Sequence, residues 1–191
     1  MKKNTKIFYA NSISKKYLNS EYKKKIKKNC FSILKNIAIN LDTSENAFHT
    51  LSNRFKFNFK IKDIKRFKKF KTVMVIGMGG SILGAEAIYF FLKKKIKKNF
   101  IFLDNIDEEK IKKYKIKKNL NSTLFIVISK SGNTIETLSN ISALNIVKKR
   151  SKNIIVISEK TNNPLFLMSK KMELFYIEHK KYVGGRYSVF S

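Results

Sequence analysis

The chain has 191 residues, and its 42 lysines and arginines against 13 aspartates and glutamates give a formal net charge of +29. This length allows one domain with a core of its own, or one domain and part of another. A single cysteine, Cys30, excludes an internal disulfide, and no stretch approaches the roughly 18 apolar residues of a membrane-spanning helix. We therefore expect a cytoplasmic protein that does not span a membrane.

The positive charge comes almost entirely from lysine, because only four basic residues are arginines, at positions 54, 66, 150 and 186. Lysine, asparagine, isoleucine and phenylalanine are all abundant, which is typical of an AT-rich coding sequence. The lysine runs at 23–28 and 93–98 carry no interleaved aromatic residue and the run at 112–118 carries only Tyr114, so none offers a platform on which successive bases could stack. We interpret the charge as a solvated surface and expect no nucleic-acid partner. The alternative, a basic nucleic-acid binder, predicts a steeply salt-dependent affinity.

The first predicted element is an amphipathic helix over residues 12–40, where apolar side chains recur at helical spacing among lysines. Cys30 lies inside this pattern, so the sequence predicts a buried thiol. Residues 55–62, FKFNFKIK, alternate apolar and polar side chains, which indicates either a half-exposed strand or an extended connection. We interpret residues 1–70 as a helical N-terminal extension.

After residue 70, short β-branched apolar runs alternate with helical patterns. The predicted strands are 72–76, 100–103, 124–128, 154–157 and 174–177, and the predicted helices are 81–97, 107–117, 132–149 and 165–171. Strands that are apolar on both faces and separated by helices indicate a parallel sheet covered on both sides. The sequence therefore predicts an α/β fold with a doubly wound five-stranded parallel sheet over residues 71–180.

A glycine-rich loop, GMGGSILG, follows the first predicted strand. We expect Ser81 to cap the next helix and Gly80 to adopt a positive φ. The N–H groups at such a helix start favour an anion, although a tight turn without a ligand is the alternative. A dinucleotide-binding fingerprint would require glycine at position 82, where Ile82 stands.

A second loop, SKSGNT, follows the third predicted strand. The hydroxyl groups of Ser129, Ser131 and Thr134, with the N–H groups of the helix start, suit a group the size of a phosphate. The alternative is that these hydroxyls only cap the helix. The helix that follows is expected to face the core with Ile135, Leu138, Ile141 and Leu144. No P-loop string occurs, which argues against a nucleoside triphosphate.

The two loops, together with VGGRYSVFS at the end of the chain, resemble a known family. GMGGSILGA followed by SKSGNTIET is similar to the sugar isomerase (SIS) domain, a flavodoxin-like fold that holds phosphosugars at these two loops. The GGRYS segment resembles the glucose-6-phosphate isomerase, or phosphoglucose isomerase, family in particular. The resemblance covers residues 72–191.

The resemblance implies interconversion of glucose 6-phosphate and fructose 6-phosphate through a cis-enediolate, in glycolysis and gluconeogenesis, with no cofactor or metal. The substrate-binding residues that it implies are Gly80, Ser81, Ser129, Lys130, Ser131, Thr134 and Gly185. Lys130 would act through its backbone, and Arg186 would lie beside the reacting carbons. A guanidinium suits this place because it stays charged while the negative charge develops. The resemblance also implies a homodimer of the full-length enzyme.

The catalytic base is missing from the loops, because Glu86 and Glu136 both fall inside predicted helices. In the resembled family the base, a ring-opening histidine and a closing lysine all lie downstream of the GGR segment. We therefore expect an N-terminal fragment that is inactive alone, with residues 181–191 beginning an active-site segment that leads to a second SIS domain. The alternative is a non-catalytic phosphosugar-binding or sensing module. His49 and His179 match no family motif and offer no metal-ligand spacing.

Overall fold

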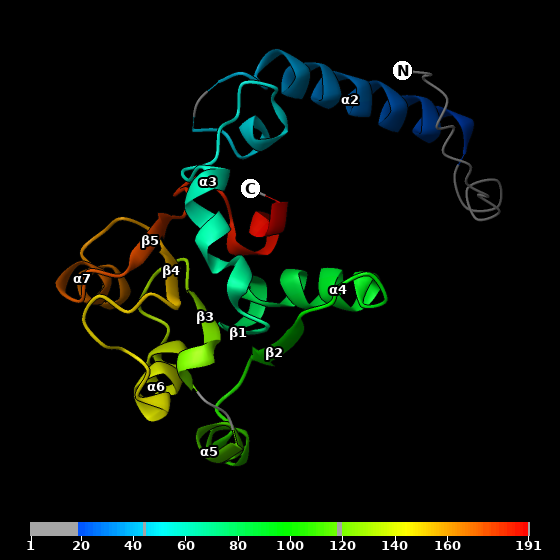
Figure 1. The fold of residues 1–191 in the computed structure, drawn as a ribbon. Coiled ribbons are helices and arrows are strands. Elements are labelled where there is room, and N and C mark those ends of the chain that lie inside the picture. The colour runs from blue at the N-terminus through cyan, green and yellow to red at the C-terminus, as the bar shows by residue number, and fades with distance from the viewer. Residues whose placement is uncertain (1–18, 44, 118–119, 191) are drawn as a thin grey trace.

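A five-stranded parallel sheet forms the centre of the molecule (Figure 1). The structure is a computed structural model of the chain and describes residues 19–43, 45–117 and 120–190. The strands are β1 (Thr72–Ile76), β2 (Asn99–Leu103), β3 (Thr123–Ile128), β4 (Ile154–Ser158) and β5 (Phe175–Glu178). They are arranged in the order β2-β1-β3-β4-β5, and every neighbouring pair is parallel. The predicted α/β class and the five predicted strands are confirmed.

Helices cover both faces of the sheet. On one face, Met74, Phe125 and Val156 pack against α5 (Glu108–Lys117), α6 (Ile135–Leu144) and α7 (Pro164–Lys171). On the other face, neighbouring strand residues such as Val75 and Leu124 pack with Phe67 and Phe70, close to α3 (Ile61–Ile64) and η2 (Lys65–Lys69). The helix α4 (Leu83–Leu92) lies on this second face beside β2. Successive side chains of a strand point to opposite faces of the sheet. Because both faces are covered here, the side chains on both must be apolar.

Two predicted helices are shorter in the structure than in the sequence analysis. The helix α6 ends at Leu144 because Asn145 adopts a left-handed conformation with a φ of 51°. Its residue Ile135 is exposed, so the prediction that it faces the core is wrong, whereas Thr137 and Asn140 are buried. The start of the predicted helix 81–97 is replaced by a short 3-10 turn, η3 (Gly79–Ser81).

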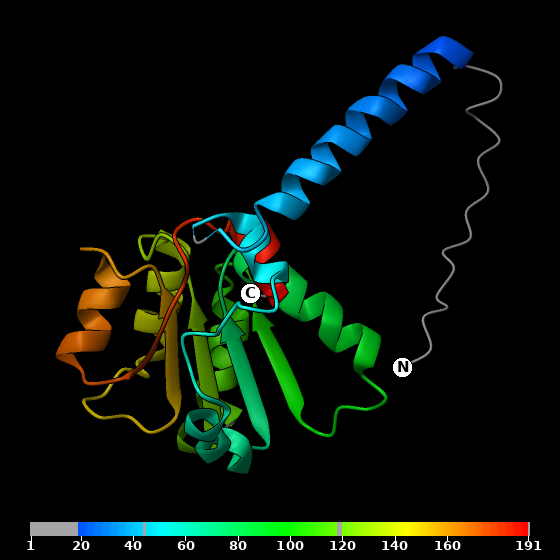
Figure 2. The ribbon, with the colours of Figure 1, turned by 90° about the horizontal axis from the view of Figure 1, so that it is seen from above.

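The helix α2 (Ser20–Ile39) projects away from the α/β body, as Figures 1 and 2 both show. It contains no buried residue, and Cys30 is exposed. The predicted buried thiol is therefore wrong, because no other described element packs over the apolar side of this helix. The part of the predicted helix before residue 19 lies outside the described residues.

Between α2 and the sheet, the described residues form η1 (Ala47–Leu51), α3 and η2, and no strand. Of the two alternatives for residues 55–62, the extended connection holds for residues 55–60, and α3 begins at Ile61. At the other end, η5 (Gly185–Phe190) packs against η3 and α4. Within the described part of the chain, no helix has the length and apolar character needed to cross a bilayer.

Candidate functional site

The loops after β1 and β3 leave the same edge of the sheet. The register pairs Ile76 with Val127, so both strands end at nearly the same level. The strand order changes direction at this pair, because β2 lies on one side of β1 while β3, β4 and β5 follow on the other. In doubly wound folds, ligands bind in the crevice at the carboxyl ends of the strands where the order reverses. The two loops singled out in the sequence therefore flank this crevice.

The glycine loop differs in two details from the sequence prediction. Gly79, and not Gly80, has a positive φ, of 51°. A side chain on Gly80 would instead collide with the backbone, since a Cβ there would lie 2.8 Å from the nitrogen of Arg186. Ser81 does not cap α4, because the helix begins after Ile82 without any side-chain capping hydrogen bond. Glycine is therefore needed at position 80 for close approach to the GGR segment.

The SKSGNT loop is held together by its own hydroxyl groups. The Oγ of Ser129 and the Oγ1 of Thr134 lie 2.8 Å apart, and the N–H of Gly132 donates to the Oγ of Ser129 (3.1 Å). The Oγ of Ser131 accepts a hydrogen bond from the N–H of Asn133 (3.3 Å). Ser129 is buried, whereas Ser131 is exposed. The structure thus brings the three predicted hydroxyls into one loop at the start of α6.

The N-terminus of α6 can accept an anion. Thr134 is its N-cap residue, and the Thr134 side chain makes no capping hydrogen bond. The first N–H groups of a helix have no partner within the helix, and the helix dipole places partial positive charge there. A phosphate group next to this loop would accept hydrogen bonds from these N–H groups and from the hydroxyl of Ser131.

Lys130 is positioned by two contacts with Glu159, which follows β4. The Nζ of Lys130 lies 3.5 Å from a carboxylate oxygen of Glu159. The N–H of Glu159 also donates to the carbonyl oxygen of Lys130 (2.9 Å). The ammonium group is therefore kept beside the loop, where it offsets the charge of the nearby carboxylate.

Arg186 lies at the same edge through its backbone, which contacts Gly80. Its side chain is exposed and forms no ion pair with the described residues. The structure thus joins the glycine loop and the GGR segment directly. The SKSGNT loop follows β3, the strand that pairs with β1.

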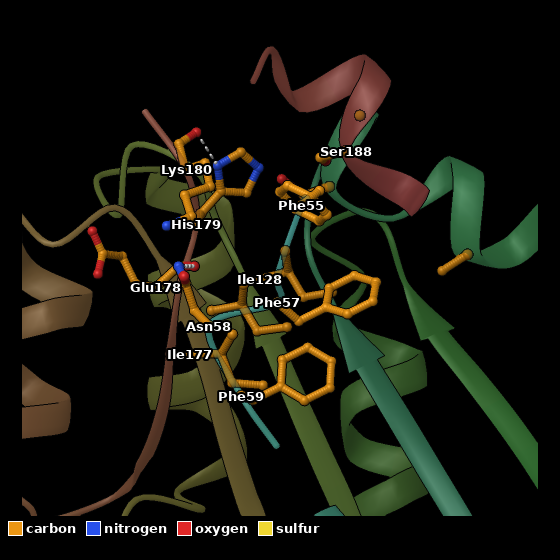
Figure 3. A pocket seen from close by; sticks show the side chains of 14 residues that line it. Phe55, Phe57, Asn58, Phe59, Ile128, Ile177, Glu178, His179, Lys180 and Ser188 are labelled. Atoms are coloured by element: carbon orange, nitrogen blue, oxygen red, sulfur yellow. Dashed lines mark hydrogen bonds between the residues drawn. The ribbon is translucent and has the colours of Figure 1, made fainter. Parts of the chain in front are cut away.

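A cavity of about 230 Å³ extends from this edge over the face of β3, β4 and β5 (Figure 3). Phe55, Phe57 and Phe59 form one wall, opposite sheet residues such as Ile128 and Ile177. The rim includes the predicted sugar-contacting residues Gly80 and Ser81, and also His179, Lys180 and Ser188. The sequence analysis assigned no role to this wall, although the alternation in FKFNFK does place all three phenylalanines on one side.

His179 is fixed at the end of β5. Its Nδ1 lies 2.9 Å from the carbonyl oxygen of Lys180, and its backbone N–H donates to the carbonyl oxygen of Ser158. Burial lowers the pKa of His179 below its ordinary value, and the charge of Lys130 adds to this effect. The hydrogen bond to Lys180 and the charge of Glu159 oppose the shift. The imidazole is therefore neutral at physiological pH.

No group of three or more histidine, cysteine, aspartate or glutamate side chains is placed to bind a metal within the ranges that the structure describes. The polar groups that converge on the strand ends are hydroxyls, backbone N–H groups and cationic side chains. These groups suit an anionic, hydroxylated ligand.

A sheet of this order, with an anion-accepting loop after β3 and a glycine loop after β1, defines the chain as an α/β protein of the sugar isomerase (SIS) type. A solved glucose-6-phosphate isomerase from Chlamydia trachomatis D/UW-3/Cx superposes with a TM-score of 0.53 and 29% sequence identity, covering 66% of this chain and 25% of that one. A model of the phosphoglucose isomerase family matches residues 26–191, and the chain belongs to that family.

Curated relatives agree with this family. A protein named glucose-6-phosphate isomerase from Borreliella afzelii (strain PKo) is 38% identical over 133 residues, which cover 63% of this chain and 25% of the relative. Another with that name, from Methanocaldococcus jannaschii, is 38% identical over 132 residues, which cover 66% of this chain and 32% of the relative. The matched part of the chain thus corresponds to only a quarter to a third of these relatives.

Proposed function

We propose that this chain carries phosphosugar-binding loops of an aldose–ketose isomerase that interconverts glucose 6-phosphate and fructose 6-phosphate. One observation carries the proposal. An anion-accepting loop after β3 and a glycine loop held against the GGR segment lie side by side at the point where the strand order reverses. A phosphate at one loop and a sugar at the other would place a single small molecule across both.

In this proposal the phosphate binds at the start of α6. Ser129, Ser131 and Thr134 supply hydroxyl groups, and Lys130 contributes its backbone N–H. A dianion is favoured here by the helix dipole and by the unpaired N–H groups of the first turn. The binding energy gained at the phosphate orients the reacting carbons at the other end of the substrate.

The sugar lies at the glycine loop in this proposal, in contact with Gly80, Ser81 and Gly185. Arg186 stabilises the negative charge that develops on the C1 and C2 oxygens after a base removes the C2 proton. Its guanidinium is suited to this task because it is charged at every working pH. Neither residues 77–82 nor residues 129–134 include a carboxylate, so we assign proton abstraction to a residue outside these two loops.

We further infer a cytoplasmic enzyme of glycolysis and gluconeogenesis that acts as a homodimer, without a nucleic-acid or membrane partner. In this proposal, residues 71–180 form the SIS domain behind a helical extension over residues 1–70. Residues 181–191 begin an active-site segment. The support for these extents is the position of the GGR segment, which leaves β5 and returns to the glycine loop.

The phosphate role is tested by removing single hydroxyl groups. We expect Ser131→Ala and Thr134→Val each to weaken binding of fructose 6-phosphate about tenfold or more, because hydrogen bonds to charged groups contribute about 1.5–3 kcal/mol. Isothermal titration calorimetry on the 191-residue chain measures the affinity, and urea unfolding checks that the variants remain folded.

Ser142→Ala is the matched control, because it removes the same hydroxyl from an exposed position of α6 and should leave the affinity unchanged. Fructose without a phosphate should bind far more weakly than fructose 6-phosphate. Equal affinities for the two sugars, or unchanged binding in both loop variants, would contradict the proposal.

A further inference from the structure

The cavity beside the glycine loop has mainly apolar walls and few polar groups. Three phenylalanines face sheet isoleucines, and the amide nitrogen of Asn58 is already used, since it donates to the carbonyl oxygen of Glu178 (2.9 Å). The cavity begins at Ile128, the residue directly before the SKSGNT loop, and reaches Gly80 and Ser81. It therefore spans the two loops that the proposed function assigns to the two ends of one substrate.

The imidazole of His179 has one nitrogen in use and one without a partner. A carbonyl oxygen can only accept, so the contact with Lys180 requires that Nδ1 carries the hydrogen. In the neutral ring Nε2 then has a free lone pair. Nε2 is buried and has no hydrogen-bond partner among the described residues. A buried polar atom without a partner costs roughly 1–3 kcal/mol, which a donor from a bound molecule would recover.

We propose that His179 contacts the sugar part of the substrate, its Nε2 accepting a hydrogen bond from a sugar hydroxyl group inside this cavity. The inference rests on the function proposed above, and adds to it a residue that selects for a hydroxylated carbon chain. Aromatic walls suit such a chain because the C–H faces of a sugar are apolar while its hydroxyls need partners.

A hydroxyl group reaches Nε2 only if a neighbouring side chain moves, because this atom is shielded from solvent. Figure 3 shows the imidazole directed across the cavity toward Phe55. Phe55 lies in a segment without regular secondary structure, and its ring packs between His49 and Phe57. We assign the movement to Phe55.

The charges around His179 keep its acceptor role at physiological pH. Lys130 and Glu159 lie close enough to affect the pKa of the imidazole, in opposite directions, and they are paired with each other. Glu178 and Lys180, its chain neighbours, are charged residues that line the cavity, whereas Lys130 and Glu159 lie outside its lining. Burial has the largest effect and lowers the pKa, so the ring binds no second proton that would turn Nε2 into a donor.

Two variants of His179 separate the ring nitrogens. In His179→Asn the amide can replace Nδ1 and keep the bond to Lys180, while the Nε2 acceptor is lost. In His179→Gln the longer side chain places an amide oxygen near the former Nε2. We expect His179→Asn to weaken binding of fructose 6-phosphate about five- to tenfold, and His179→Gln to bind within about twofold of the wild type. The affinity for inorganic phosphate should not change in either variant.

His179→Gln is the matched control, because it changes the same residue and keeps an acceptor near the place of the former Nε2. A nitrogen-15 NMR spectrum of the histidine rings adds a direct readout. The Nε2 resonance of His179 should shift with fructose 6-phosphate and stay in place with inorganic phosphate.

The outcomes distinguish this inference from the proposed function. Unchanged binding of fructose 6-phosphate in His179→Asn would overturn the inference alone. Equal weakening of phosphate binding and of fructose 6-phosphate binding would also overturn it, because such a result would indicate that His179 has only a structural role. A wild-type chain that binds neither ligand would overturn the proposed function itself.

Discussion

Gly79 and Gly80 are neighbours, yet the backbone needs each of them for a different reason. Gly79 has a φ of 51°, which residues with a Cβ rarely adopt. Gly80 has no positive φ but lies against the backbone of Gly185 and Arg186. The glycine-rich loop could be recognised from the sequence. The division of roles within it could not, because the contacting segment lies at the far end of the chain.

A methyl group at position 80 should separate the glycine loop from the GGR segment. We expect Gly80→Ala to lower the free energy of unfolding by about 1–3 kcal/mol, the usual cost of overpacking. Urea unfolding followed by circular dichroism measures this change.

Gly185→Ala is the control from the other side of the same contact, since a Cβ there would meet nothing within 4 Å. It should change the stability by no more than about 0.5 kcal/mol. Equal effects of the two substitutions would mean that the two segments do not approach each other at Gly80.

At the scale of elements, α7 and the SKSGNT loop are joined by Asn163. Its Oδ1 accepts from the N–H of Phe166 (2.9 Å) and so caps α7, while its Nδ2 donates to the carbonyl oxygen of Glu159 (2.8 Å). A Cβ on Gly132 would lie 1.8 Å from the Oδ1 of Asn163. The N-cap residue of α7 therefore also packs against the SKSGNT loop at Gly132.

Removing this amide should affect both elements. We expect Asn163→Ala to cost about 1–3 kcal/mol of stability, from the lost cap and the unpaired backbone groups, and to weaken phosphate binding as the loop loses its support. Thermal unfolding and phosphate titration measure the two effects.

Asn162→Ala is the matched control, because it makes the same change at the exposed neighbouring position. It should leave both quantities near their wild-type values. A stability loss in Asn162→Ala as large as that in Asn163→Ala would argue against the cap.

The sequence located the elements of the sheet well and their ends less well. The strands could be predicted because five apolar runs of strand length are separated by amphipathic segments. The end of α6 at Asn145 could not, since the left-handed turn there is formed by asparagine, without glycine or proline. The 3-10 turn before α4 was missed because it depends on contacts with η5, which no local pattern reports.

At the scale of the whole molecule, the core lies within the α/β body, and α2 adds nothing to it. The amphipathic pattern correctly predicted a helix, but amphipathicity indicates only that a helix has an apolar side. It does not identify what covers that side. In the structure Leu34 is 55% exposed, whereas Leu165 of α7 is fully buried.

Replacing each of these two leucines with alanine tests whether the stability comes from the α/β body and not from α2. We expect Leu165→Ala to lower the free energy of unfolding by about 2–5 kcal/mol. Leu34→Ala should change it by no more than about 0.5 kcal/mol. Chemical denaturation of both variants measures the difference, and similar losses would show that α2 is packed as tightly as the sheet helices.

The pairing of η3 with η5 also sets an order of events during protein synthesis. A nascent chain leaves the ribosome from its N-terminus, so β1 and the glycine loop emerge long before residues 185–190. The strands can pair and bury their side chains while the loop at the end of β1 is still hydrated. Only when the final turn emerges does Gly80 gain its neighbour, so this edge is the last part of the α/β body to mature.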